Sequence, residues 1–369
     1  MELKQGIAAL RKKYGDMIIR SGDEIPNVRR IPVRELPMFD YVSGGGLMHN
    51  RINEFVGENG SLKSWVMYKL LGIYQHIEWS THSVGLINKI TYNKDKSIKD
   101  FTLRRGKKIA SPVALRSALI DVEHTYTPSW GEKMGIDTKG LIVSQPDRLS
   151  TGVDTAEILL ADPTIGLVAF DSLSAVGTDE EIDNSMDSNQ MGVAARFWNK
   201  AIRKMQAAMN RNPNGNITLI VINSDYKGIG PYAAIETRNG GQLKRSKSLS
   251  VHFKGLKPIE EKIDDVPTII GRNVVLKCLK NKGGGPTGRT GPFFYSEIDY
   301  DLCAQNGTDY IGQIVELAVR GGIVDRVGNT YFYGKYKAAG LGGFLKKISQ
   351  SDDFDEIRKR VYAEIINPV

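Results

Sequence analysis

The chain has 369 residues, of which 41% are hydrophobic and 25% are charged, and its net charge is +8. This composition is typical of a globular protein with one large domain and appendages, or with two domains. No apolar run approaches the roughly 20 residues that a membrane span requires, so no membrane partner is expected. The positive charge suits a polyanionic partner such as nucleic acid.

The two cysteines, Cys278 and Cys303, lie far apart and match no spacing of metal ligands. Such cysteines are typical of reduced thiols in a cytosolic protein. The amino-terminal residues lack the apolar core of a signal sequence. Together these features predict a cytoplasmic protein.

Residues 3–14 predict a short amphipathic helix, because apolar side chains recur there at helical spacing. Its apolar stripe needs a partner surface, which is either the chain's own core or a neighbouring subunit. Periodicity does not separate these two possibilities. Residues 28–34 are extended and basic, and Pro32 restricts them to an edge strand or a linker.

A Gly-rich stretch between a β-prone run at 51–56 and a helical run from Trp65 predicts a phosphate cradle. In such a cradle backbone N–H groups and the helix dipole bind the anion. Lys63 is expected to reach the outer phosphates, and the Ser64 hydroxyl to ligate Mg²⁺. The alternative is an ordinary strand–turn–helix joint. Leu62 departs from the pattern, because it stands where a second glycine is expected. The predicted nucleotide-binding residues here are Gly57, Glu58, Asn59, Gly60, Ser61, Leu62, Lys63, Ser64 and Trp65.

Residues 88–108 carry eight Lys or Arg against two Asp, with apolar residues between them. This pattern predicts a basic hairpin inserted into the core. Such a hairpin either projects into solvent without a binding role or contacts nucleic acid.

Two buried strands are predicted to end in carboxylates. Residues 118–122 are followed by Glu123, and residues 166–170 by Asp171. In an open α/β sheet, ligands bind in the crevice outside the carboxyl ends of the strands. Asp171 is therefore predicted to hold the Mg²⁺ shell opposite the cradle, the alternative being a helix N-cap.

Residues 191–209 predict an amphipathic helix with a basic stripe. The helix lies between two predicted loops, 177–190 and 224–242. The stripe is either a solvated face or a track for a polyanion. From about residue 310 the pattern predicts a small α+β appendage.

The chain resembles the bacterial RecA recombinase family, including its divergent phage members, over nearly its whole length except the 88–108 segment. The likeness is densest at residues 118–124, 144–147, 170–172, 191–196 and 280–282. The resemblance implies an α/β fold with three parts. These are an N-terminal oligomerisation helix and strand at 1–36, a RecA-like P-loop ATPase core at 37–307 with a mostly parallel central sheet flanked by helices, and a small α+β domain at 308–369.

The resemblance also implies catalytic roles. Glu123 matches the family's catalytic carboxylate, which orients and activates the attacking water, as in-line attack on a γ-phosphate requires. Trp130 falls where the family places an aromatic ring on adenine. Lys280 and Lys282 match a pair that reaches across a subunit interface to the neighbour's nucleotide, where they act with Lys63.

The resemblance places DNA-binding residues in the two loops and on the basic helix. Glycines there let the backbone approach phosphates without reading sequence. Ser224 stands where the family has a Gln that senses the γ-phosphate, and Ser246 where it has an aromatic subunit contact. Together with Leu62, these two changes leave the strength of the coupling between nucleotide and DNA open. The implied DNA-binding residues are Met191, Arg196, Arg203, Arg238, Gly240, Gly241 and Gln242.

The function implied by the resemblance is a DNA-dependent ATPase recombinase that uses ATP and Mg²⁺. It would form helical filaments on single-stranded DNA, pair it with homologous double-stranded DNA, and act with a single-stranded-DNA-binding protein or mediator in a bacterial cell or phage-infected host. Two alternatives are a hexameric helicase or motor ATPase on the same core, and a non-catalytic mediator. The presence of Lys63, Glu123 and Asp171 disfavours the mediator.

Overall fold

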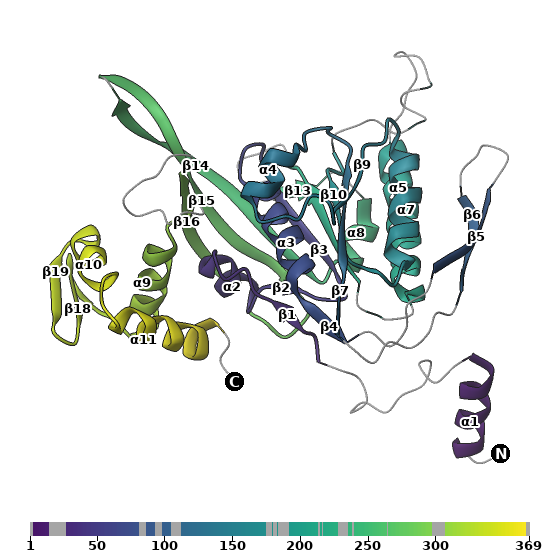
Figure 1. The fold of residues 1–369 in the computed structure, drawn as a ribbon, viewed down its shortest axis with the longest axis horizontal. Helices are drawn as coiled ribbons and strands as arrows, with labels where there is room; N and C mark the ends of the chain where they lie inside the picture. Colours follow the sequence, from purple (N-terminus) through teal and green to yellow (C-terminus); the bar gives the residue numbers. More distant parts are fainter. Residues whose placement is uncertain are drawn as a thin grey trace.

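An eight-stranded sheet forms the centre of the molecule in the order β16-β15-β14-β3-β11-β10-β8-β9 (Figure 1). Its strands are β3 (Ile52–Gly57), β8 (Arg116–Asp121), β9 (Ile142–Ser144), β10 (Ile165–Asp171), β11 (Thr218–Asn223), β14 (Leu249–Ile263), β15 (Val266–Asn281) and β16 (Thr290–Ser296). The six strands from β14 to β9 in that order are parallel, and β15 and β16 add an antiparallel edge. The predicted mostly parallel sheet is confirmed. This computed structural model describes residues 3–14, 27–80, 86–92, 98–104, 112–174, 179, 183, 192–212, 215, 217–227, 235–237, 240–263, 265–296 and 307–366.

Helices cover both faces of this sheet. One face packs against α3 (Lys63–His76), and the other against α5 (Leu149–Ala161), which in turn packs against α7 (Val193–Arg211). Strands that are buried on both faces read as continuous apolar runs, and β10 is buried along its whole length. The sheet therefore separates two apolar cores.

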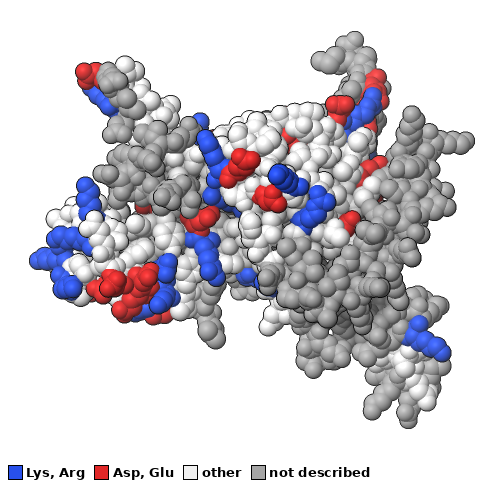
Figure 2. Space-filling view, in the orientation of Figure 1, with Lys and Arg blue, Asp and Glu red and all other residues white. Residues whose placement is uncertain are grey.

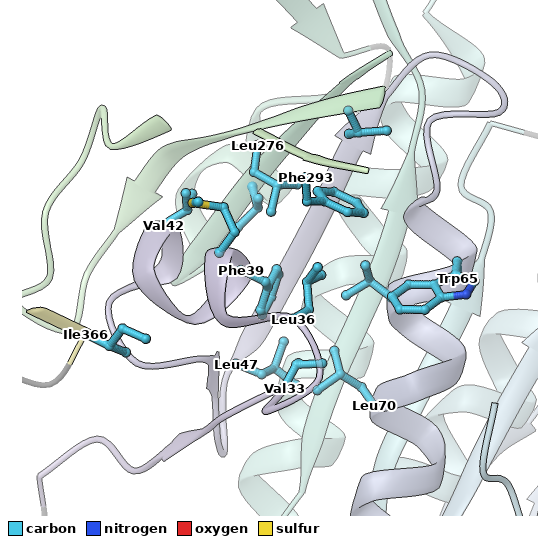
Figure 3. Close-up of a cluster of buried hydrophobic side chains, with 14 of the residues drawn as sticks. Val33, Leu36, Phe39, Val42, Leu47, Trp65, Leu70, Leu276, Phe293 and Ile366 are labelled. Carbon is cyan, nitrogen blue, oxygen red and sulfur yellow. The ribbon is translucent and has the colours of Figure 1, made fainter. Parts of the chain in front are cut away.

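The larger core joins the α3 face of the sheet to its antiparallel edge. Figure 3 shows Leu36 and Phe39 beside α3 residues and close to Leu276 and Phe293 of β15 and β16. Phe39 belongs to α2 (Pro37–Ser43), and its ring meets Phe55 of β3 edge-on at a centroid distance of 5.6 Å. Backbone pairing of β1 (Arg30–Ile31) with β2 (Leu47–Met48) closes this region.

The N-terminal helix α1 (Leu3–Tyr14) lies apart from the sheet (Figure 1). Ile7 is half-buried, and Leu10 is 42% exposed. The core therefore leaves Leu10 largely uncovered.

A hairpin stands where the basic insertion was predicted. β4 (Glu78–Ser80) pairs with β7 (Pro112–Ala114) to form its stem, and β5 (Leu86–Tyr92) pairs antiparallel with β6 (Ile98–Arg104). In Figure 1 it projects beside α7, at the end of the sheet away from β16.

The C-terminal segment forms an α+β unit beyond the antiparallel edge. Its elements are α9 (Tyr310–Arg320), β17 (Asp325–Val327), β18 (Thr330–Tyr333), β19 (Tyr336–Ala339), α10 (Leu341–Ile348), α11 (Asp353–Arg360) and the π-helix η2 (Val361–Ile366). The α2 backbone is tied to this unit, because Met38 N donates to Gln313 Oε1 over 3.1 Å. Among the residues that the structure describes, no helix combines the length and apolar character needed to cross a membrane.

Asp40 is a buried carboxyl group at the junction of α2 and η2. Val33 N donates to its Oδ1 over 2.7 Å, and the Tyr362 hydroxyl lies 3.4 Å from its Oδ2. Burial raises the pKa of Asp40 to about 8, although both hydrogen bonds oppose the shift. The folded chain therefore keeps a proton that the unfolded chain releases near pH ~4.

We expect the free energy of unfolding to fall as the pH rises from about 4 to about 8, by up to ~1.4 kcal/mol per pH unit from this group. Asp40→Asn keeps the shape but has no proton to lose, so its curve should be flatter by that slope. Urea unfolding of both proteins across this range measures the difference. If the free energy of unfolding changed with pH in the same way in both proteins, the raised pKa would not belong to Asp40.

Candidate nucleotide site and DNA-facing surface

The loop between β3 and α3 is shaped by close backbone contacts. A side chain at Gly57 would place its Cβ 2.1 Å from the carbonyl oxygen of Phe253, so only glycine fits there. Gly60 has a φ of 74°, in the left-handed region that glycine adopts without strain. The loop thus turns tightly and directs the first N–H groups of α3 into its concavity.

Leu62, the departure from the expected pattern, also adopts the left-handed conformation, with φ 68° and ψ 19°. This explains why the pattern has glycine at that position. A left-handed leucine costs about 1–2 kcal/mol, and its half-buried side chain packs against the larger core. The loop therefore keeps the cradle shape despite the substitution.

Lys63 lies inside the loop. Its ammonium group donates to the carbonyl oxygens of Gly57 at 2.9 Å and Glu58 at 2.6 Å. Burial lowers the pKa of Lys63, and the charges of Asp171, Asp225, Glu123 and Glu58 oppose that shift. The cation is thus held at the phosphate position with carboxylates around it.

Ser64 and Asp171 form the predicted metal pair. The Ser64 hydroxyl donates to Asp171 Oδ2 over 2.8 Å. Burial raises the pKa of Asp171 to about 7, with Glu123 and Asp121 adding to the rise and Ser64 opposing it. A hydroxyl and one carboxylate are hard oxygen ligands that suit Mg²⁺, which usually binds one or two carboxylates together with phosphates. The residues present therefore fit the metal.

Glu123 lies beside this pair on the loop that follows β8. It is exposed, and the Ser172 hydroxyl donates to its Oε1 over 2.6 Å. Asp121 shapes the loop, because Tyr126 N at 3.0 Å and Gln145 Nε2 at 2.8 Å donate to its Oδ2. The loop thus presents one carboxylate to solvent and anchors the other.

A cavity of about 230 Å³ opens next to the cradle. Trp130 of α4 (Pro128–Lys133) and Tyr295 of β16 contribute aromatic walls, and Arg272 of β15 contributes a guanidinium. The ring of Trp65 lies 5.6 Å from that of Tyr295 and is only 3% exposed, so it forms part of the buried wall. The sequence reasoning missed Arg272 and Tyr295, because no local pattern links them to the cradle.

Trp130→Ala should weaken ATP and ADP binding equally, by roughly tenfold, because a stacked ring acts on the base and not on the phosphates. Trp130→Phe keeps a ring and should retain most of the affinity. Titration with a fluorescent ADP analogue measures the nucleotide affinity of each variant. Unchanged affinity in the alanine variant would show that the adenine ring does not stack on Trp130.

One of the carboxylates near Lys63, Asp225, was also missed. Asp225 begins β12 (Asp225–Lys227), and its Oδ2 lies 2.7 Å from Nε2 of His252 on β14. β14 pairs with β3 so that His252 stands opposite Val56, just before the cradle. The pair ties the start of the second predicted loop to β14, the neighbour of the strand that leads into the cradle.

The lysine pair lies at the end of β15, beside α8 (Gly240–Ser246). Lys280 donates to the carbonyl oxygen of Lys244, and Lys282 donates to that of Arg245 over 2.6 Å. Cations at the last carbonyls of a helix are favourable. Within one chain, both lysines therefore cap the carboxyl end of α8.

The predicted DNA-facing residues gather on α7 and α8. Arg196 and Arg203 are exposed along α7, and α8 lies beside that helix. Gln242 N donates to Asn199 Oδ1 over 2.8 Å. Gly240 and Gly241 form the first turn of α8, whereas Met191 and Arg238 lie outside the described residues.

Ser246 also joins these two helices. Its hydroxyl donates to Gln206 Oε1 over 3.0 Å and lies 3.0 Å from Gln242 Nε2. Ser246, which stands where the family has an aromatic subunit contact, therefore makes its hydrogen bonds within its own subunit.

Comparison with known proteins settles the family. The family model described as the RecA N-terminal domain matches residues 108–297, which is more than half of the chain. The chain belongs to the RecA family. RecA of Chloroherpeton thalassium is 26% identical over 370 residues, which cover 99% of this chain and 88% of that protein. RecA of Cytophaga hutchinsonii is 30% identical over 253 residues, which cover 66% of this chain and 67% of that protein.

A crystal structure of the RadB recombinase is 13% identical and covers 73% of this chain and 95% of its own, with a TM-score of 0.44. RecA-family proteins are recombinases built on a P-loop ATPase core. The sheet, the cradle and the strand-end carboxylates described above are the parts of such a core.

Proposed function

We propose that this chain is a DNA-dependent ATPase recombinase that forms helical filaments on single-stranded DNA and pairs it with homologous duplex DNA. The observation that carries the proposal is the meeting of four side chains at one edge of the parallel sheet. Lys63 and Ser64 come from the cradle, and Asp171 and Glu123 from the ends of two neighbouring strands. This is the arrangement that phosphoryl transfer to water requires.

Each residue has a distinct task in hydrolysis. Lys63 and the N–H groups at the start of α3 bind the outer phosphates. Ser172 occupies Glu123 Oε1, and Oε2, which no hydrogen bond among the described residues engages, would accept a proton from the attacking water. Ser64 and Asp171 would hold Mg²⁺, which when bound neutralises charge on the phosphate oxygens.

We infer that neighbouring subunits share the nucleotide. Lys280 and Lys282 need only leave the carbonyl oxygens of α8 to donate to a phosphate of a neighbouring subunit's nucleotide. Leu10 of α1, which is 42% exposed, offers part of a surface for the adjacent subunit. Repetition of such a head-to-tail contact generates a helical filament when the rotation does not close.

DNA binding is expected to be mainly electrostatic, through phosphate contacts that tolerate any sequence. Arg196, Arg203 and the segments leading into α8 would hold the single strand. Figure 2 shows further Lys and Arg on the outer edge of the C-terminal unit, which would suit double-stranded DNA. The exposed cations of that unit include Arg326, Lys335, Lys337, Lys346 and Lys347.

Electron microscopy with single-stranded DNA and a non-hydrolysable ATP analogue tests the proposal. Open helical filaments are expected. Closed rings with directional unwinding would favour the hexameric motor. Subunits that bind a partner recombinase without forming filaments or hydrolysing ATP would favour the mediator, although Lys63, Glu123 and Asp171 argue against it.

A further inference from the structure

Arg272 reaches the cradle loop from the antiparallel edge of the sheet. It lies on β15, directly opposite Tyr295 of β16. A Cβ added to Gly60 would lie 3.3 Å from its Nη1 and 3.7 Å from its Cζ, so the guanidinium rests against the loop. Both Arg272 and Gly60 line the cavity of about 230 Å³ that Trp130 also lines. The arginine therefore spans the distance from the aromatic walls to the phosphate cradle.

The donors of this guanidinium are unused. Within the described part of the chain, no carboxylate or carbonyl oxygen accepts a hydrogen bond from Arg272. Arg289, just before β16, shows the contrast, because it donates to the carbonyl oxygen of Tyr41 over 3.1 Å and lies over that ring at 4.5 Å. A guanidinium offers five N–H donors in a planar fork that fits two oxygens of a phosphate. Arg272 thus presents a ready anion contact beside the cradle.

The electrostatics of the site favour a second cation. Lys63 is the cation inside the loop, and four carboxyl groups, including those of Asp171 and Glu123, act on it. A triphosphate brings further negative charge into these acidic surroundings, and the repulsion must be offset for the nucleotide to bind. Arg272 supplies positive charge at the edge of the loop.

The position of Arg272 along β15 separates it from the lysine pair. Lys280 lies eight residues further along the same strand. At about 3.3 Å per residue, their Cα atoms are roughly 26 Å apart. Arg272 therefore lies at the cradle of its own subunit, whereas Lys280 and Lys282 lie at the carboxyl end of α8.

We propose that Arg272 binds the phosphates of the nucleotide held by its own subunit, from the β15 side of the cradle. The inference rests on the proposed function, and it adds a cation in cis to the lysine pair that the neighbouring subunit supplies. The purine base is the competing ligand, because Trp130 and Tyr295 line the same cavity. The contact at Gly60 favours the phosphates, because Gly60 belongs to the loop that cradles them.

The test compares two partial ligands: tripolyphosphate, which has no base, and adenosine, which has no phosphate. Each competes with a fluorescent ADP analogue for the unmutated protein and for Arg272→Ala, without DNA and at low protein concentration, so that single subunits are measured. Arg272→Ala should weaken the binding of tripolyphosphate, ADP and ATP by roughly tenfold or more, the effect of losing charge-assisted hydrogen bonds. The affinity for adenosine should not change.

Two further variants separate the planar fork from the charge and from its position. Arg272→Lys keeps the charge but not the fork, so it should recover only part of the affinity for tripolyphosphate. Lys277→Ala removes an exposed cation from the same strand. Because Lys277 is five positions away, it points to the other face of β15, and its loss should leave all four affinities unchanged. Urea unfolding of Arg272→Ala should match that of the unmutated protein, because the guanidinium is exposed.

Three results would overturn the inference. Unchanged affinity for tripolyphosphate in Arg272→Ala would leave the arginine without a phosphate contact. A loss confined to adenosine would assign it to the base, and a loss seen only in filaments on DNA would assign it to the neighbouring subunit's nucleotide. An unmutated protein that binds ATP but forms no filaments would instead refute the proposed function, and the binding series would still decide the role of Arg272.

Discussion

Replacing Glu123 by glutamine should lower kcat for ATP hydrolysis by about 10²- to 10⁴-fold, which is the range for losing a positioned general base. The amide still accepts the hydrogen bond from Ser172 but cannot take a proton from water. Nucleotide binding should persist, because Lys63, Ser64 and Asp171 remain in place. Steady-state phosphate release and a binding titration measure the two effects separately.

The matched control is Glu132→Gln, which neutralises an exposed carboxylate on α4 near the same cavity. It should hydrolyse ATP at the wild-type rate. If Glu123→Gln also hydrolysed at that rate, Glu123 would not be the base.

Replacing both Lys280 and Lys282 by alanine should reduce DNA-stimulated hydrolysis by about 10³-fold or more, as expected for cations that stabilise transition-state charge from a neighbouring subunit. Binding of ATP to a single subunit should stay unchanged, because neither lysine contacts its own cradle among the described residues. Hydrolysis assays at saturating DNA, together with ATP titrations at low protein concentration, distinguish these outcomes.

Lys277→Ala is the control for this pair, because Lys277 is exposed on the same strand, β15, before the two lysines. Its hydrolysis should match the wild type. A double variant with full DNA-stimulated activity would show that the site is complete within one subunit.

The cradle and the strand-end carboxylates were predictable because they are local. A buried strand followed by Gly57 to Ser64, or by Asp171, specifies its geometry within a few residues of sequence. The left-handed turn at Leu62 was visible only as a departure from the pattern. Its backbone conformation follows from the loop as a whole, which overrides the preference of a single leucine.

Other parts of the site depend on pairings between distant segments. Arg272 and Tyr295 reach the cavity only because β15 and β16 pair in a particular register, with Arg272 opposite Tyr295. The contact between Ser174 and Ser224 depends on the pairing of β10 with β11. Periodicity carries no information on such registers, so the partners of Ser224 were not foreseen.

The capping of α8 by Lys280 and Lys282 could not be predicted for the same reason. β15 returns antiparallel along β14 and brings its last residues back to the carboxyl end of α8. The family resemblance implied only a role toward a neighbouring subunit. The structure adds an intramolecular position that the lysines would have to leave to reach a neighbouring subunit.

Mixing two inactive variants is the most direct test of a nucleotide site shared between subunits. Lys63→Ala lacks a working cradle but keeps Lys280 and Lys282, whereas the double lysine variant has the opposite defect. Random assembly in equal amounts on single-stranded DNA should pair intact halves at roughly a quarter of the interfaces, since a head-to-tail contact joins unlike surfaces. ATP hydrolysis should therefore recover to about that fraction of wild type. A mixture with no more activity than the sum of its two components would contradict the shared site.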